Sequence, residues 1–188
     1  YNSEGEDYGT VTCNYLLEKM QADKSVCAIT SATPTVFGFT PVIRKKAGKQ
    51  FMDVGIAEEH AMALASGIAK NDGKPFYGVY SSFLQRTYDQ LTQDVCINKS
   101  PVTIAVFAAS VYGMSDVTHL GIYDIPMISN IPELVYLAPV TKEEYLAMLD
   151  WSLEQNEHPV AIRVPASLVS DGKPFSKDLA KLIEFELT

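Results

Sequence analysis

Short runs of almost uninterrupted apolar residues recur along the chain, and helical patterns separate them. An apolar run of four to eight residues bounded by turn signals is typical of a buried parallel strand. Six such runs are present, and each is followed or preceded by Gly, Pro, Asn or Thr. They are Val26–Ile29, Phe51–Val54, Phe76–Tyr80, Val102–Ala109, Leu134–Ala138 and Val160–Val164.

Helical periodicity fills several of the intervals between these runs. Apolar residues keep the i, i+3, i+4 spacing of one buried face in segments that begin near residues 10, 61, 84 and 142. Thr141 and Glu144 form a capping box at the start of the last of these helices. Strands that alternate with helices predict an α/β fold, a doubly wound and mainly parallel sheet of about six strands with helices on both faces. The Thr- and Pro-rich stretch 30–41 predicts a loop, and 110–130 predicts a long functional loop with short helical turns.

The chain is organised around the stretch FMDVGIAEEHAMALASGIA, which runs from Phe51 to Ala69. A short strand ends near Gly55, and a helix with a buried face follows. Glu58 and Glu59 lie in the first turn of this helix, where unpaired backbone N–H groups favour acidic side chains. These acids could serve only to stabilise the helix. Ligands of open α/β sheets, however, bind where a strand end leads into a helix start, so the stretch is also a candidate site.

Composition narrows the function only a little. The 188 residues suffice for one domain with a substantial core, and the net charge of −8 argues against nucleic acid or an anionic membrane as the main partner. Cys13, Cys27 and Cys96 lie far apart within apolar segments, which indicates buried free thiols in a reducing compartment rather than disulfides or a metal site. No apolar run approaches the length of a membrane span, so we expect a cytoplasmic protein.

Two motifs carry a resemblance to a known family. GIAEEHA, followed by YSSFLQRTYDQ, resembles the pyrimidine-binding domain of thiamine-diphosphate enzymes of the transketolase group. Within that group these two motifs are most similar to those of 1-deoxy-D-xylulose-5-phosphate synthase, which typically has GIAEQHA and YSTFLQRAYDQ. The similarity continues in the same order through THLGIYD, IPELV and AIRVP, and so covers most of the chain. YSSFLQRTYDQ is the more specific of the two motifs.

The resemblance implies a defined role for Glu58. In these enzymes the 4′-amino group of the cofactor removes a proton from the thiazolium, and it does so in an imino form. A carboxyl group hydrogen-bonded to the pyrimidine N1′ promotes that form, and an apolar pocket keeps the carboxyl protonated. By resemblance Glu58 is this catalytic and cofactor-binding residue, and Glu59 is a neighbour without that role.

The resemblance assigns five further positions. Phe83 corresponds to the aromatic residue that stacks on the aminopyrimidine ring, and Tyr80 lines the same pocket. Arg86 also lines it and reaches toward substrate phosphate. His119, in THLG, corresponds to a catalytic histidine that faces the substrate, and Arg163 to an arginine that binds substrate phosphate. Without the resemblance, Phe83 would be read as core and Arg86 as a surface helix residue.

Several positions depart from the family pattern. Where the synthase usually has an Asp-Arg pair after its central strand, this chain has Phe107 and Ala108. The GADGQTHQG loop of the family is here GMSDVTHLG, so that the family's acid falls on Ser115, with Asp116 one place later. RYPRG is replaced by RVPAS, which puts Ala166 in place of the second arginine. These losses favour a change of substrate.

The resemblance also implies what the chain needs from elsewhere. Such enzymes hold Mg²⁺ and the diphosphate through a GDG-type motif in a separate domain, and no such motif occurs in this sequence. We therefore expect residues 10–165 to be a pyrimidine-binding domain that is inactive alone, preceded by a flexible segment (1–9) and followed by a linker to a further domain (166–188). Its partners would be a diphosphate-binding domain or subunit, a keto acid and a sugar phosphate, with a homodimer as the assembly.

Three functions remain open at this point. The first is a synthase of the kind named above, which joins pyruvate to glyceraldehyde 3-phosphate with loss of carbon dioxide. The second is a section or subunit of a split transketolase-like enzyme that acts on other sugar phosphates. The third is a non-catalytic partner subunit, against which the retained Glu58, Phe83 and Arg86 argue.

Overall fold

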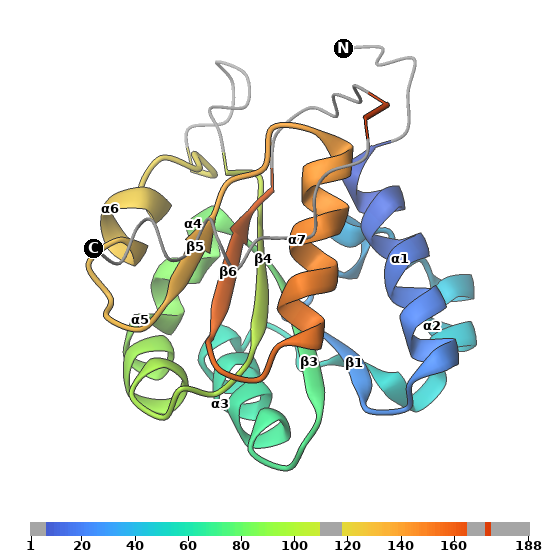
Figure 1. The fold of residues 1–188 in the computed structure, drawn as a ribbon, viewed down its shortest axis with the longest axis horizontal. Coiled ribbons are helices and arrows are strands. Elements are labelled where there is room, and N and C mark those ends of the chain that lie inside the picture. Colours follow the sequence, from blue (N-terminus) through green and yellow to red (C-terminus); the bar gives the residue numbers. More distant parts are fainter. Residues whose placement is uncertain (1–6, 110–117, 165–171, 174–188) are drawn as a thin grey trace.

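A six-stranded sheet forms the centre of the molecule in a computed structural model (Figure 1). The structure describes residues 7–109, 118–164 and 172–173. The strand order is β2-β1-β3-β4-β6-β5, and every pairing between neighbouring strands is parallel. The predicted doubly wound parallel sheet is therefore confirmed. The chain reverses its direction of winding between β1 and β3, which is the kind of position where open sheets bind ligands.

All six predicted strands are present, with ends that differ by at most two residues. Their bounds are β1 Val26–Thr30, β2 Phe51–Asp53, β3 Lys74–Tyr80, β4 Thr103–Phe107, β5 Val135–Leu137 and β6 Val160–Arg163. β1 and β4 are buried at every residue, as their continuous apolar sequences predict. β2 lies at one edge of the sheet and is only partly buried.

The long helices also agree with the predicted periodicity. The α-helices are α1 Tyr8–Ala22, α2 Pro41–Ala47, α3 Glu58–Ala69, α4 Ser81–Leu84, α5 Tyr88–Gln90, α6 Asp124–Ile128 and α7 Lys142–Glu154. In α7 the Thr141 side chain accepts the N–H of Glu144, as the capping box predicts, while the Glu144 carboxylate accepts the N–H of Val140. α1 begins two residues before the predicted start because Asp7 caps it through the N–H of Thr10.

Helices cover both faces of the sheet (Figure 1). α1 and α7 lie side by side on one face, joined by an ion pair between Lys19 and Asp150. α3 and the helical segments that follow β3 cover the other face, where Met62, Leu84 and Leu91 are fully buried. Two buried clusters, one on each face, thus fix the sheet between them.

The prediction of a simple loop over 30–41 is wrong in part. Within it a 3₁₀ turn, η1 (Pro34–Phe37), carries Phe37 and Phe39 into the core, where both are fully buried. The Phe37 ring lies 5.6 Å from Phe76 and stacks at 5.9 Å on Phe107. The chain continues into α2 (Pro41–Ala47), whose last turn carries Arg44, Lys45 and Lys46.

The helix predicted after β3 is broken into short segments. Between α4 and α5 lies the 3₁₀ turn η3 (Gln85–Thr87), and a π-helical segment, η4 (Leu91–Cys96), follows α5. The spacing of Leu84, Tyr88, Leu91 and Val95 predicts one apolar helical face. Leu84, Leu91 and Val95 are buried, whereas Tyr88 is 42% exposed, so the prediction is wrong at Tyr88. The remaining short helix, η2 (Gly48–Gln50), leads into β2.

Two further observations concern the predicted environment of the chain. Cys13, Cys27 and Cys96 are free and buried, as predicted. Within the ranges that the structure describes, the helices are too short or too polar to span a membrane.

Candidate functional site

The predicted site residues come from elements that lie at the end of the sheet where the strands terminate. Because all six strands are parallel, their carboxyl ends all lie at this end of the sheet. β3 ends at Tyr80 and β6 at Arg163, while α3 begins at Glu58 shortly after β2. The Asp53 carboxylate accepts the backbone N–H groups of Ala32 (3.0 Å) and Gly55 (3.1 Å). It therefore holds together the loops that follow β1 and β2, directly before Glu58.

Glu58 is a buried carboxylate with unused hydrogen-bonding capacity. Its side chain is 3% exposed, and its Oε2 atom has no hydrogen-bond partner within the described part of the chain. Arg86 Nε lies 3.3 Å from this oxygen, at ion-pair distance but without hydrogen-bond geometry. A buried carboxylate oxygen without a donor is unfavourable unless a ligand or water completes it. Glu58 is thus suited to receive a ligand that donates or shares a proton.

Arg86, on η3, also reaches the neighbouring acid. Its Nη2 atom lies 3.7 Å from Glu59 Oε1, and both side chains are about half exposed. The interaction is weakened by solvent, as exposed ion pairs generally are. Glu59 nevertheless has a structural partner that the sequence did not predict.

Three rings lie close together where β3 ends. The Phe83 ring centroid lies 5.4 Å from that of Tyr80 and 5.2 Å from that of His119, both in edge-to-face geometry. His119 Nδ1 lies 2.7 Å from the hydroxyl oxygen of Thr118. The structure therefore brings together Tyr80 and Phe83, which sequence analysis placed in one pocket, and His119, which it expected to face the substrate.

A buried tyrosine near Glu58 was missed at the sequence level. Tyr77, on β3, is fully buried, and its hydroxyl lies 2.8 Å from the hydroxyl of Ser31, which follows β1. Burial raises the pKa of Tyr77, a hydrogen bond with Ser31 lowers it, and the negative charges of Glu58 and Glu59 raise it further. The Tyr77 hydroxyl therefore stays protonated. No periodic signal distinguishes it from an ordinary strand residue.

Arg163 also lies at the carboxyl end of the sheet, but its partners are not those of Arg86 and Glu58. Its Nε donates to Asp124 Oδ2 at 2.8 Å, and Nη2 donates to the carbonyl of Gly121 at 3.1 Å. The Tyr136 hydroxyl donates to the same Asp124 oxygen at 2.6 Å. Sequence analysis singled out neither Asp124 nor Tyr136. Asp124 is a charged residue with no exposed surface, a feature that only the folded chain reveals.

The positions that depart from the family pattern are only partly described. Phe107 is 5% exposed and belongs to the aromatic cluster around Phe37, so it is a core residue rather than a polar site residue. Ala108 follows with a positive φ of 51°. Ser115, Asp116 and Ala166 lie outside the described residues.

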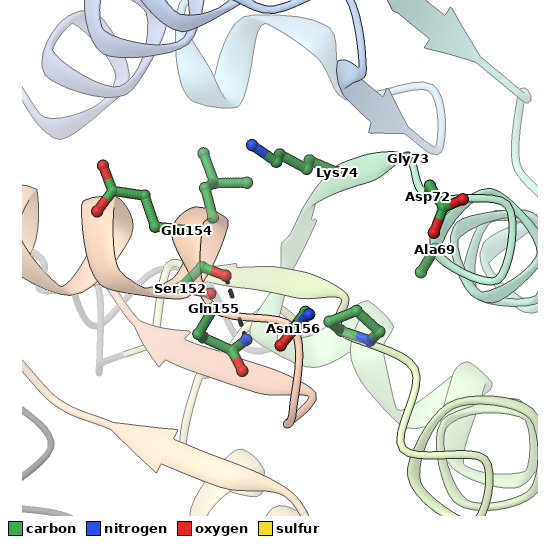
Figure 2. A pocket seen from close by; sticks show the side chains of 10 residues that line it. Ala69, Asp72, Gly73, Lys74, Ser152, Glu154, Gln155 and Asn156 are labelled. Carbon is green, nitrogen blue, oxygen red and sulfur yellow. Dashed lines mark hydrogen bonds between the residues drawn. The ribbon is translucent and has the colours of Figure 1, made fainter.

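A separate pocket of about 250 Å³ lies at the opposite end of the sheet, where the strands begin (Figure 2). It is lined by residues at or just before the starts of β3, β4 and β6, among them Asp72, Lys74 and Asn156, and by the last residues of α7. Its walls include none of the predicted site residues. Among the described residues, no group of three or more His, Cys, Asp or Glu side chains could hold a metal ion.

Comparison with known sequences identifies relatives of the chain. The sequence matches the family model described as "Transketolase, pyrimidine binding domain" over residues 6–171. It is 39% identical to 1-deoxy-D-xylulose-5-phosphate synthase of Clostridium acetobutylicum over 170 residues, which cover 90% of this chain and 26% of the relative. The corresponding protein of Clostridium perfringens is 40% identical over 173 residues, 91% of this chain and 28% of the relative. The chain thus spans about a quarter of the length of these relatives.

Solved structures share the fold. A transketolase from Leishmania mexicana superposes with a TM-score of 0.79 at 16% identity, over 96% of this chain and 28% of that one. A structure described as "Split gene transketolase, inactive beta4 tetramer" gives a TM-score of 0.72 at 22% identity, over 93% of this chain and 55% of that one. At these identities the likeness concerns the fold.

Proposed function

Because the chain belongs to the transketolase pyrimidine-binding domain family, we propose that it supplies the pyrimidine half of a thiamine-diphosphate site in a carbon–carbon bond-forming transferase. The observation that carries the proposal is the Glu58 carboxylate, which is buried at the start of α3 with Oε2 lacking a hydrogen-bond partner among the described residues. This orphaned oxygen fits a ligand ring nitrogen that shares a proton with it. Thiamine diphosphate, when bound, supplies the nucleophilic carbon that adds to a substrate carbonyl.

In this proposal the residues of the chain have separate tasks. Glu58 holds a proton at the pyrimidine N1′, in a pocket where its burial excludes water. Phe83 contacts the pyrimidine ring, and Tyr80, which packs against Phe83, lines the same pocket. Arg86 would turn from Glu58 toward the substrate, since its half-exposed side chain has room to move. His119 exchanges protons with the substrate next to these rings.

The complete activity depends on parts that this chain does not supply. We propose a synthase reaction in which pyruvate is joined to glyceraldehyde 3-phosphate with loss of carbon dioxide, because the curated relatives carry that enzyme's name. Mg²⁺ and the diphosphate would be held by a diphosphate-binding domain or subunit, so that the chain alone is inactive. A homodimeric assembly and a cytoplasmic location complete the proposal.

A split transketolase-like subunit is the second candidate. Phe107 and Ala108 replace the Asp-Arg pair of the synthase, and Phe107 lies in the core, which favours a change of substrate. A split gene transketolase with the same fold provides a precedent for such a division between chains.

Two neighbouring glutamates offer a matched test of the role of Glu58. The longest natural form of the protein, with any chain that carries the diphosphate motif, would be assayed for thiamine-diphosphate binding with Mg²⁺ by calorimetry, and for turnover of pyruvate with glyceraldehyde 3-phosphate. Glu58→Gln should lower kcat by about 100-fold or more, the range of positioned proton-transfer groups. Glu59→Gln changes the same charge beside it and should have little effect on kcat.

The outcomes separate the candidates. Unchanged turnover in Glu58→Gln would show that the catalytic assignment is wrong. Wild-type binding of the cofactor with turnover of sugar phosphates but not of pyruvate would favour the split transketolase-like enzyme. Loss of binding in Phe83→Ala would support the assignment of the aromatic residue, whereas a folded complex that binds no cofactor would indicate a non-catalytic subunit.

A further inference from the structure

Asp124 is a buried carboxylate that joins three parts of the chain at the carboxyl end of the sheet. It begins α6 and has no exposed surface. Its Oδ2 atom accepts hydrogen bonds from Arg163 Nε (2.8 Å), at the end of β6, and from the Tyr136 hydroxyl (2.6 Å), on β5. A buried charge is normally kept only where it is paired. Asp124 is paired twice through a single oxygen, which concentrates both donors at one point.

The contact with Asp124 sets the orientation of the Arg163 guanidinium. A guanidinium is planar and carries five N–H groups in a fixed fork. Nε donates to Asp124 and Nη2 to the Gly121 carbonyl, so that one edge of the fork faces the chain itself. The other edge, formed by Nη1 and the second N–H of Nη2, has no partner among the described residues. Two hydrogen bonds on one edge prevent rotation of the plane and leave the second edge for a bidentate anion.

The same contacts tie the segment that carries His119 to the sheet. Gly121 and Asp124 follow His119 closely in the chain, and both are held by Arg163. The His119 ring lies 5.2 Å from Phe83. A displacement of the 121–124 backbone would therefore move His119 relative to the rings of Tyr80 and Phe83.

We propose that Asp124, supported by Tyr136, is a positioning residue that presents the second edge of the Arg163 guanidinium to the phosphate group of the substrate and holds the His119 segment in place. The inference rests on the proposed function, since it takes Arg163 as the residue that binds substrate phosphate. Tyr136 contributes a second donor: burial, followed by its hydrogen bond with Asp124, raises the pKa of Tyr136 and keeps its hydroxyl protonated. The carboxylate is thereby held in place from β5 as well as from β6.

A comparison of two acceptors tests this role. The longest natural form of the protein, with any chain that carries the diphosphate motif, would be assayed with pyruvate and either D-glyceraldehyde 3-phosphate or unphosphorylated D-glyceraldehyde. Asp124→Asn keeps the shape of the side chain but removes the charge that orients Arg163. It should raise KM for the phosphorylated acceptor by about tenfold to a hundredfold, the cost of a misplaced binding group. KM for the unphosphorylated acceptor should rise by much less, because that acceptor has no phosphate for Arg163 to bind. Displacement of the His119 segment should lower kcat with both acceptors.

Tyr136→Phe provides a milder variant that removes only one donor. It should raise KM for the phosphorylated acceptor in the same direction and by less, while thermal unfolding shows that the protein is folded. If Asp124→Asn does not fold, the Tyr136→Phe result decides the question alone. Equal changes of KM for both acceptors, or no change for either, would show that the network is only structural and would overturn the inference. Absence of wild-type turnover with both aldehydes would overturn the proposed function and the inference with it.

Discussion

Replacement of Gly78 by Ala should destabilise the protein, because the space beside this residue is filled by an aromatic ring. Gly78 lies in β3, paired with Thr30 of β1 on one side and Ala105 of β4 on the other. A Cβ atom at this position would lie 2.6 Å from both Cδ1 and Cε1 of Phe37. Separations below 3.0 Å between such atoms are essentially never observed, so one of the two residues has to move.

Neither side of this contact can move easily. The Phe37 ring has no exposed surface and packs against Phe39, Phe76 and Phe107 at centroid distances of 5.2, 5.6 and 5.9 Å. The backbone of Gly78 is held by strands on both sides. Overpacking of a well-filled core costs about 1–3 kcal/mol, and the lower backbone entropy of the unfolded Ala variant offsets up to about 1 kcal/mol of this. We expect a net loss of about 1–2 kcal/mol in the free energy of unfolding.

Gly67 provides a matched control for the same substitution. It lies on the exposed side of α3, and a Cβ there would meet no atom within 4 Å. Ala is favoured over Gly in a helix by about 1 kcal/mol, so Gly67→Ala should stabilise the protein. Urea unfolding followed by circular dichroism and by the fluorescence of Trp151, the single tryptophan, would measure both variants. A Gly78→Ala variant as stable as the wild type would refute the packing described for Phe37.

Three further predictions concern charged and titratable groups. Arg163→Met removes the ion-pair partner of the buried Asp124 and should lower the free energy of unfolding by about 3 kcal/mol or more in urea titrations; a loss below about 1 kcal/mol would contradict the pairing. Hydrogen bonds from Lys74 and Ser25 hold the pKa of Asp23 well below its ordinary value of 3.8, so the stability that this carboxylate contributes is present above about pH 4 and is lost as the pH falls further. Lys74→Met should therefore make urea midpoints less dependent on pH below pH 4. Burial raises the pKa of Cys27 to about 11 from 9.0, so stability should fall as the pH rises from 9 to 11; midpoints with an equal alkaline slope in Cys27→Ala would contradict this.

The strands could be predicted from the sequence because the sheet is covered on both faces. β1 and β4 are buried at every residue, and a strand in that environment is apolar throughout. The segment around Phe37 and Phe39 could not be predicted in this way. Its two aromatic residues follow neither the helical nor the strand period within a Thr- and Pro-rich context, and their burial depends on the cluster formed with Phe76.

Some residues of the candidate site could likewise be predicted from the sequence, and others could not. Glu58, Phe83 and His119 could be predicted because local motifs carry a resemblance, and the structure places the rings of Phe83 and His119 in contact. The proposed roles of these residues stay predictions. Asp124 and Tyr136 could not be selected, because their importance lies in a pairing with Arg163 that spans distant parts of the chain. A pairing of this kind has no local sequence signal.

The stacking of Phe107 on Phe37 has a consequence for how the family can change. The resemblance described above places an acid at this position in the synthase. Here the position belongs to an aromatic cluster, and a direct exchange of Phe107 for Asp would place a carboxylate among buried rings without a partner. Phe37 would have to change as well. A polar side chain at the end of β4 therefore requires a second substitution in the same aromatic cluster, so that two positions far apart in the sequence can change only together.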